Sequence, residues 1–459
     1  MPPTVLTREI CRNYIEAHLL DPAISNDGKA NDGVGYIGLE LESFPYIIDP
    51  QKGVQPAQLY GSKESLVNAL IHVSEQHGGL VQYLDQTGMD ERHEPLVGAI
   101  HFPDGSTFQF EPGGQIEIAT APCNCIEQLN DQLTGMQQIL GRVTQNNQFQ
   151  FAQYGTNPWF TADKIGLQMN KTRYRAMARY FDEIGAFGRM MMVQTSSLHV
   201  NVDSGSDWST RSKRYVAANL LAPFATALFS NSPITAGKVT GHKSYRSFIW
   251  QQLDTTRTGV FPIEKRSSTF DKEAIIDAYL DFALKAPVIF IEDFGDEPFP
   301  LHVTMEYWIN HSIKGLSPVL AHFMNHLTLL FPEVRLKGYL ELRSVDAPPP
   351  EWQMTPALFY GGLLYSDQYL DKVLDLLLPF ASQIPLFMKK ATYGLESDDL
   401  FHISKKLVQL AIDGFSTLPE SFKRVNDLQQ LIAFSQRFPL RRQTFADELL
   451  RKLNKISFS

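Results

Sequence analysis

Four segments of the chain alternate between apolar and polar side chains. They lie at residues 36–44, 113–120, 196–203 and 339–346. Because successive side chains of a strand point to opposite faces, residues two apart in each segment share a face. One face is uniformly apolar in every segment, as Leu39 and Leu41 illustrate in the first. We therefore predict four strands whose apolar faces pack against helices.

Apolar residues spaced three and four apart predict helices between and after these strands. The predicted helices lie near the N-terminus and at residues 62–79, 126–143, 171–181 and 213–229, with a helical pattern beyond about residue 366. Ser62 can cap the second of these helices, and Gly78 and Gly79 end it. A polar loop is expected at 23–33, and a strand region at 190–202.

Strands and helices mix without a strict βαβ rhythm, which favours an α+β fold with a large, mainly antiparallel sheet. We expect the sheet and its backing helices to occupy residues 1–365. A C-terminal helical region, residues 366–459, is expected to pack on the same unit.

Composition narrows the class of protein. The chain has 459 residues, of which 43% are hydrophobic and 20% are charged, and its formal net charge is −9. These values are ordinary for a globular protein, and without a basic tract they argue against a nucleic-acid partner. The N-terminus carries Glu9 and Glu16 and lacks the apolar run of a secretory signal. No apolar run approaches the ~18 residues of a membrane span, so no membrane partner is expected.

The chain has three cysteines, Cys11, Cys123 and Cys125. An odd, small number in a chain of this length argues for reduced thiols and a cytoplasmic setting. Cys123 and Cys125 stand one residue closer than a C-x-x-C pair and have no second pair, so we expect a strand-to-helix corner there and no zinc site.

The polar faces of the four strands carry side chains that can bind metal ions or a substrate. They present Glu40 and Glu42; Gln115 and Glu117; Ser197, His199, Asn201 and Asp203; Glu341 and Arg343. A single alternating strand with two glutamates is most often a solvated edge. If the four strands are neighbours, however, at least four carboxylates converge, and like charges that close need compensating cations. Mg²⁺ prefers such oxygen ligands and normally shares its shell with substrate phosphates.

Arginines form a second group, in the segment 245–259. Arg246 and Trp250 lie four apart, on one face of a helix, and Arg257 follows Asp254. Arginine offers a planar fork for carboxylate or phosphate, although Arg257 alone could equally be a loop residue with a surface partner. With no Walker-type loop or Rossmann fingerprint in the sequence, phosphate binding would rest on metal and arginine.

Several ordered blocks carry a family resemblance. They are Gly38-x-Glu40-x-Glu42, Glu111-Pro-Gly-Gly-Gln-Ile-Glu117, and residues 225–233, 246–250, 254–259 and 332–343. Together they resemble the plant-type glutamate–cysteine ligases over roughly residues 34–390. Bacterial members and the first enzyme of ergothioneine synthesis share the pattern, so the pathway stays open.

The resemblance implies a fold similar to the catalytic domain of glutamine synthetase, with a curved antiparallel sheet and helices behind it. It also implies ATP-dependent ligation of L-glutamate to L-cysteine through a γ-glutamyl phosphate, with release of ADP and phosphate. That reaction is the first step of glutathione biosynthesis. The implied cofactors are two or three Mg²⁺ ions, with ATP as co-substrate, and a monomer or homodimer is expected.

Roles carried over by the resemblance assign each candidate residue. The metal ligands would be Glu40, Glu42, Glu117, Glu341 and His199, although plant members look to have Gln at the last position. Arg246, with Trp250 beside it, would hold the carboxylate of bound glutamate, whereas Arg257 and Arg343 would be catalytic and face the phosphates. Substrate would also meet Ser196, Ser197 and Asn201. Glu111 is expected only to brace the hairpin, and the regulatory cysteines of plant members have no clear counterparts.

Three alternatives stay open. The acceptor could be another amine, including that of ergothioneine-type thiol synthesis. A non-catalytic relative is disfavoured because Glu40, Glu42, Glu117, Arg246 and Arg343 are all present. A metal-dependent amide hydrolase could use the carboxylates and the histidine, but it would not need the arginines.

Overall fold

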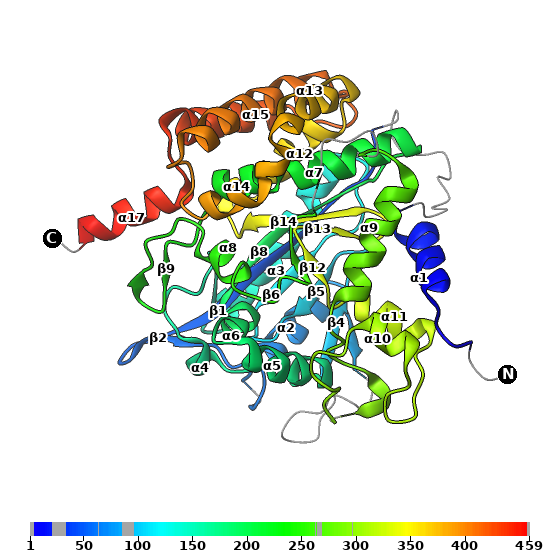
Figure 1. Cartoon of the computed structure of the whole chain (residues 1–459). Helices are drawn as coiled ribbons and strands as arrows, with labels where there is room; N and C mark the ends of the chain where they lie inside the picture. Colours follow the sequence, from blue (N-terminus) through cyan, green and yellow to red (C-terminus); the bar gives the residue numbers. More distant parts are fainter. Residues whose placement is uncertain are drawn as a thin grey trace.

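A sheet of ten strands runs through the molecule, and the four predicted strands lie side by side in it (Figure 1). The computed structural model describes residues 4–20, 34–62, 64–84, 96–261, 263, 269–295 and 297–456. Its strands are β1 Ile37–Asp49, β2 Gly53–Pro56, β3 Leu80–Tyr83, β4 Val97–His101, β5 Thr107–Phe110, β6 Ile116–Ala119, β7 Phe149–Ala152, β8 Ser197–Val202, β9 Ile234–Thr235, β10 Lys238–Val239, β11 Thr258–Gly259, β12 Phe331–Pro332, β13 Val334–Leu336 and β14 Leu340–Asp346.

Helices surround this sheet (Figure 1). They are α1 Arg8–Tyr14, α2 Leu66–Glu75, α3 Ile126–Asn146, α4 Ala162–Ile165, α5 Thr172–Ile184, α6 Phe187–Gln194, α7 Trp208–Leu228, α8 Tyr245–Trp250, α9 Lys272–Lys285, α10 Met305–Asn310, α11 Leu320–Leu327, α12 Thr355–Leu364, α13 Asp367–Leu377, α14 Ile384–Ala391, α15 Asp398–Thr417, α16 Asp427–Arg437 and α17 Phe445–Ile456. A π-helix, Ile15–Leu20, continues α1.

The main sheet has the strand order β13-β14-β8-β1-β6-β5-β4-β3, with neighbours antiparallel. In this register Glu40 faces His199, Glu42 faces Glu117, and Glu341 faces Asn201. The four alternating strands, whose adjacency the sequence left open, are therefore neighbours. Their polar side chains come to one face of one sheet.

The opposite face of the sheet is the apolar core. Leu39, Leu41, Ile116, Leu198 and Val200 are fully buried there. Helices α2, α3, α7 and α12 contact the sheet strands and supply the other half of this core. The predicted α+β fold, with a large antiparallel sheet backed by helices, is confirmed.

Two local predictions were wrong. The helix expected from Ser62 begins only at Leu66, where the side chain of Ser65 accepts the amide hydrogen of Asn68 and caps the helix. In the strand region expected at 190–202, residues 190–194 instead belong to α6, and the strand starts at Ser197. A short apolar run such as 190–193 fits a buried helix as well as a strand. The polar loop expected at 23–33 lies outside the described residues.

The C-terminal helices pack so closely that two glycines are required. A Cβ on Gly362 of α12 would lie 2.1 Å from the carbonyl oxygen of Ala411 on α15. A Cβ on Gly414 of α15 would lie 2.0 Å from the carbonyl oxygen of Gly362. These helices therefore meet backbone to backbone. The proposed division of the chain at residue 365 stays a prediction.

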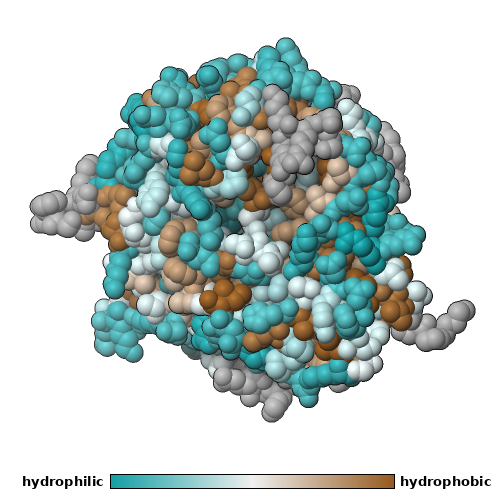
Figure 2. Space-filling model, viewed as in Figure 1, coloured by the Kyte–Doolittle hydropathy of each residue, from teal (hydrophilic) through white to brown (hydrophobic). Residues whose placement is uncertain are grey.

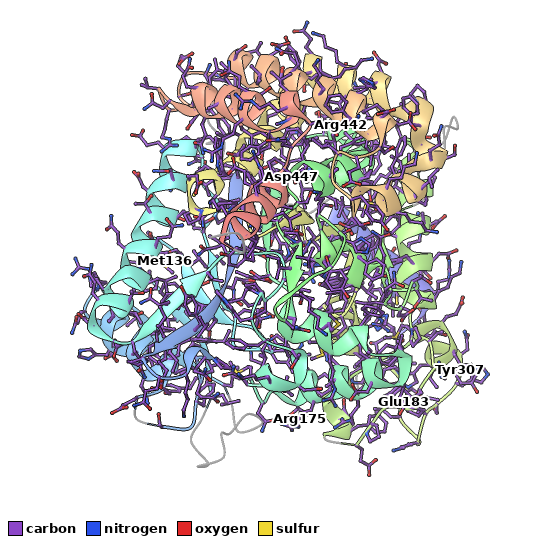
Figure 3. All side chains as sticks on the ribbon, turned by 90° about the vertical axis from the view of Figure 1, so that its left-hand side faces the viewer. Met136, Arg175, Glu183, Tyr307, Arg442 and Asp447 are labelled. Carbon is purple, nitrogen blue, oxygen red and sulfur yellow. The ribbon has the colours of Figure 1, made fainter. Side chains whose placement is uncertain are left out.

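Helix α17 extends away from the body, and its first turn is tied down (Figures 1 and 3). Asp447 accepts hydrogen bonds from Lys243 and from the backbone N–H of Thr444. Arg442 donates to the carbonyl oxygen of Leu395. Hydrophilic residues cover much of the face seen in Figure 2, with apolar residues in separate groups between them. Within the described part of the chain, every helix is too short or too polar to span a membrane.

Candidate active site

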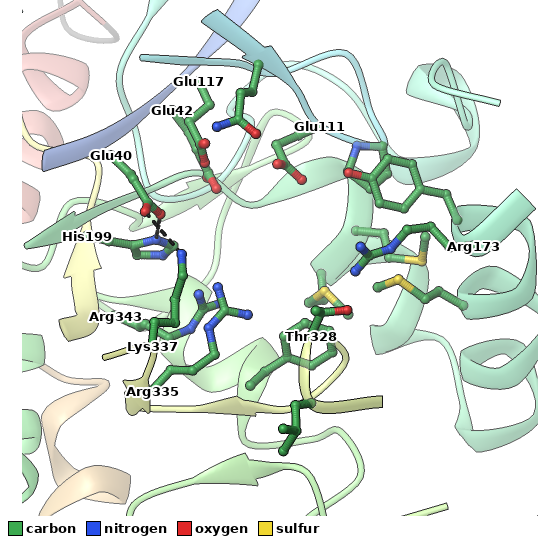
Figure 4. Close-up of a pocket in the computed structure, with 18 of the residues that line it drawn as sticks. Glu40, Glu42, Glu111, Glu117, Arg173, His199, Thr328, Arg335, Lys337 and Arg343 are labelled. Carbon is green, nitrogen blue, oxygen red and sulfur yellow. Dashed lines mark hydrogen bonds and ion pairs between the residues drawn. The ribbon is translucent and has the colours of Figure 1, made fainter. Parts of the chain in front are cut away.

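A cavity of about 460 Å³ lies on the polar face of the sheet (Figure 4). This volume is within the range of sites that bind small molecules. One wall is acidic and carries Glu40, Glu42, Glu111 and Glu117; the wall opposite is basic and carries Arg335, Lys337 and Arg343. Lys171 and Arg173 also line the cavity. The sheet positions the acidic residues because they all project from β1 or from the β5–β6 hairpin.

Glu40, His199 and Glu341 form one cluster in this site. Each offers a ligand atom, and these atoms lie within 4.8 Å of one another. The Nδ1 of His199 lies 3.0 Å from Glu40, and its Nε2 lies 2.9 Å from the hydroxyl of Ser197. Burial, together with the nearby charge of Arg343, lowers the pKa of His199 to about 4. A neutral ring of this kind donates from one nitrogen and accepts at the other, which fits both contacts.

Glu42, Glu111 and Glu117 all have raised pKa values. Burial and the charge of Glu111 raise the pKa of Glu42 to about 7. Burial and the charges of four other glutamates raise the pKa of Glu117 well above its ordinary value, and burial also raises that of Glu111. The carboxylate of Glu42 accepts the amide hydrogen of Ser197 at 2.7 Å. These shifts are the expected result of gathering like charges in a buried site.

Glu341 is surrounded by cations instead. Although it is fully buried, Arg335, Arg343 and Lys337 hold its pKa well below the ordinary value. Arg343 donates to one carboxylate oxygen at 2.8 Å, and Arg335 and Lys337 lie within 2.8 and 3.1 Å of the other.

The acidic wall fits Mg²⁺. Its donors are carboxylate oxygens, which this ion prefers, and burial together with repulsion among the glutamates raises the pKa values of Glu42 and Glu117. Beside them, the side-chain oxygen of Asn201 is buried without a partner. Bound cations would relieve the repulsion among the glutamates.

Arg246 lies beside the main cavity and not in its wall. Together with Trp250, Glu333 and Arg343 it lines a second cavity of about 10 Å³. Its guanidinium donates to the carbonyl oxygen of Arg343 at 2.8 Å and lies 3.8 Å from Asp346. Trp250 and Arg343 line both cavities, so they connect them.

The structure corrects the role expected for Arg257. Its side chain is fully buried and outside the cavity wall. It donates to Asp254 at 2.9 Å and to the carbonyl oxygens of Leu329 and Pro287, and it stacks on Tyr180. Arg257 thus uses these donors to hold chain segments together, away from the cavity wall.

We expected Ser196, Ser197 and Asn201 to line the substrate. The structure places them behind the side chains that line the cavity. The hydroxyl of Ser196 donates to the carbonyl oxygen of Glu42 at 3.0 Å. Ser197 contacts Glu42 and His199, and Asn201 donates to Glu40 at 3.1 Å. They position the acidic wall but do not form it.

Sequence reasoning missed part of the basic wall and undervalued Glu111. The backbone of Glu111 does brace the hairpin through a hydrogen bond with Gln115, but its side chain also enters the cavity. Arg335 and Lys337 had a readable signal, because Val334, Leu336 and Leu340 alternate with polar residues next to Glu341. No such signal marks Lys171, Arg173 or Tyr14 of α1, because their segments reach the cavity only in the tertiary structure.

Comparisons with known proteins agree with this geometry. Residues 67–411 match the family model described as Glutamate-cysteine ligase family 2 (GCS2). The chain is 34% identical to a chloroplastic glutamate–cysteine ligase of Medicago truncatula and to one of Arabidopsis thaliana, over 319 residues in each case. The alignments cover 67% of this chain but only 61% and 59% of those relatives. In fold, the chain resembles a glutamate–cysteine ligase of Francisella tularensis in complex with AMP (TM-score 0.53, 12% identity, 92% of this chain and 85% of the other).

Proposed function

Because the chain belongs to glutamate–cysteine ligase family 2, we propose that it joins the γ-carboxylate of L-glutamate to the amine of L-cysteine at the expense of ATP. The products would be γ-glutamylcysteine, ADP and phosphate, in the first step of glutathione biosynthesis. The observation that carries the proposal is the single cavity with an acidic wall facing a basic wall. A triphosphate with its metal ions needs both walls, because carboxylates bind the metal ions and cationic side chains bind the phosphates.

The two walls would have different roles in phosphoryl transfer. Glu40, Glu42, Glu117 and Glu341, with His199, would hold two or three Mg²⁺ ions. When bound, these ions neutralise phosphate charge and make the γ-phosphate more electrophilic. Arg343 and Arg335 reach the cavity from the opposite wall, where their planar forks suit phosphate oxygens. Attack by the γ-carboxylate of glutamate on the γ-phosphate gives γ-glutamyl phosphate and ADP, and the amine of the acceptor then displaces phosphate.

The groups around the second cavity suit recognition of the carboxylate of glutamate; the cavity itself, at about 10 Å³, has room for no more than about one water. Arg246 is held there by Asp346 and by the carbonyl oxygen of Arg343, and Trp250 closes the space beside it. A buried guanidinium held in this way is oriented for a carboxylate before substrate arrives. The surrounding protein would also keep water from the acyl phosphate.

The basic wall also weighs against an amide hydrolase, which would need the metal ligands but not Arg335, Lys337 and Arg343 on the facing wall. Other amine acceptors fit the same cavity. We further propose a cytoplasmic enzyme, by the cysteine argument above, that acts as a monomer or homodimer.

The decisive experiment incubates the purified protein with ATP, Mg²⁺ and L-glutamate against a panel of amines that includes L-cysteine, L-2-aminobutyrate and L-histidine. The proposal requires release of ADP and phosphate that depends on both glutamate and an acceptor. Formation of AMP, or turnover without ATP, would overturn it. Glu117→Gln should abolish turnover while circular dichroism stays unchanged; if this variant is active, the metal assignment is wrong.

A further inference from the structure

Lys337 places an ammonium group beside Glu40 (Figure 4) and beside Glu341, two of the carboxylates proposed as metal ligands. Its Nζ lies 3.1 Å from Oε1 of Glu341 and 3.6 Å from Oε1 of Glu40. Both carboxylates belong to the cluster whose ligand atoms lie within 4.8 Å of one another. A divalent ion bound by these two residues would compete with the ammonium for the same oxygens, and the two cations would repel each other at this range.

The backbone of Lys337 is held by the hairpin, whereas its side chain is long and partly exposed. Lys337 stands at the tip of the β13–β14 hairpin, where its N–H donates to the carbonyl oxygen of Tyr339 at 3.0 Å. Gly338 between them has a φ of 81°, a conformation that favours glycine. The side chain is 38% exposed and carries its charge on a flexible four-carbon stem. The ammonium can therefore leave the carboxylates while the hairpin stays in place.

The charges around this position differ for the two carboxylates. Glu341 keeps Arg335 and Arg343 as partners if Lys337 departs. Besides Lys337, the described hydrogen-bond partners of Glu40 are Asn201 and the ring of His199, so Lys337 is the one Lys or Arg that Glu40 meets among the described ion pairs. The ammonium is thus the cation that balances Glu40 in the metal-free protein.

We propose that Lys337 is an internal counter-ion that holds the Glu40–Glu341 position in the metal-free enzyme and that a divalent cation must displace it to bind there. The inference rests on the metal role proposed above for Glu40 and Glu341. Lys337 thereby regulates metal binding, because its ammonium lowers the affinity of this position for free metal. The displaced ammonium remains in the cavity, where it can pair with substrate phosphates.

Mn²⁺ binding to the full-length, metal-free protein, followed by calorimetry without nucleotide or glutamate, tests the idea. Lys337→Met removes the ammonium but keeps the length of the stem. Lys171→Met is the matched control, because it removes a lysine from another part of the same cavity. We expect Lys337→Met to bind Mn²⁺ about tenfold more tightly than the wild type, and Lys171→Met to change affinity by less than about threefold. In a Glu40→Gln background, Lys337→Met should lose most of its effect.

The outcomes separate this inference from the proposed function. If the wild type binds Mn²⁺ and Lys337→Met binds it equally or more weakly, Lys337 does not compete, and the inference fails while the metal site stands. Equal gains in both lysine variants would mean a general charge effect and would also overturn it. If neither the wild type nor Lys337→Met binds Mn²⁺, the metal assignment of the proposed function fails, and this inference fails with it. As a second readout, saturating Mn²⁺ should raise the Tm of Lys337→Met more than that of the wild type.

Discussion

Replacing Glu42 with glutamine should stabilise the metal-free protein at alkaline pH while it destroys activity. Glu42 is buried on the acidic wall, and burial together with the charge of Glu111 raises its pKa from 4.5 to about 7. The amide of glutamine has nearly the same shape and can still accept the backbone N–H of Ser197, which Glu42 accepts at 2.7 Å. The substitution therefore removes the charge and little else.

The size of the effect follows from the shift in pKa. One pKa unit corresponds to about 1.4 kcal/mol, so moving the carboxyl from 4.5 to about 7 costs the folded protein about 3 kcal/mol once Glu42 is ionised. Because the folded pKa lies above the unfolded one, the folded state binds more protons, and stability falls as pH rises. The loss is absent below pH 4.5, grows between pH 4.5 and 7, and is complete above pH 7. For a chain of 459 residues the entropy of unfolding is about 1 kcal/mol per kelvin. A free-energy difference of about 3 kcal/mol therefore makes the Tm values of Glu42→Gln and the wild type differ by about 3 °C at pH 8.

Thermal unfolding in EDTA at pH 5 and pH 8 measures this difference. We expect Glu42→Gln to match the wild type near pH 5 and to exceed it by about 3 °C at pH 8. Adding Mg²⁺ should raise the Tm of the wild type and should do so much less for the variant, whose turnover should fall at least about a hundredfold. Glu75→Gln, at an exposed position of α2, is the control and should change neither profile. The electrostatic argument is refuted if Glu42→Gln is less stable than the wild type at pH 8, or if the gap does not widen with pH.

Two further substitutions test features away from the acidic wall. Arg257→Met leaves Asp254 and the carbonyl oxygens of Leu329 and Pro287 without their donor, so the free energy of unfolding should drop by about 3–5 kcal/mol. Chemical denaturation measures this drop, and a loss below about 1 kcal/mol would restore Arg257 as a candidate ligand. Gly362→Ala drives a Cβ into the carbonyl oxygen of Ala411 and should cost at least about 3 kcal/mol. Gly135→Ala on α3 meets nothing within 4 Å and should instead stabilise by up to about 1 kcal/mol, so equal effects of the two alanines would refute the close packing of α12 and α15.

The sequence predicted the parts of the site that depend on strand geometry. Glu40, Glu42, Glu117 and Glu341 alternate with apolar residues, and that alternation fixes their face whatever the strand order is. The sequence left open whether these strands are neighbours, and the structure shows that they are.

The remaining parts depend on tertiary contacts that no local pattern reports. An arginine looks the same in sequence whether it is buried against Asp254, as Arg257 is, or exposed to a ligand. Ser197 and Asn201 lie on the expected face, but the side chains of Glu42 and Glu40 reach beyond them into the cavity. Arg173 enters the site because α5 packs against α6, a contact between helices that sequence spacing does not encode.

The order of strands across the sheet also determines when the site can exist during synthesis. Glu341 on β14 reaches Glu40 only after β14 pairs with β8, and β8 lies 138 residues earlier in the chain, counted from Val202 to Leu340. A ribosome must therefore release the chain beyond Asp346 before the ligand set is complete. Until then β8 has an open edge, which is where a nascent chain is exposed to aggregation. Fragments that end before β14 should be unable to hold the cations, and recombinant yield should respond to conditions that slow synthesis relative to folding.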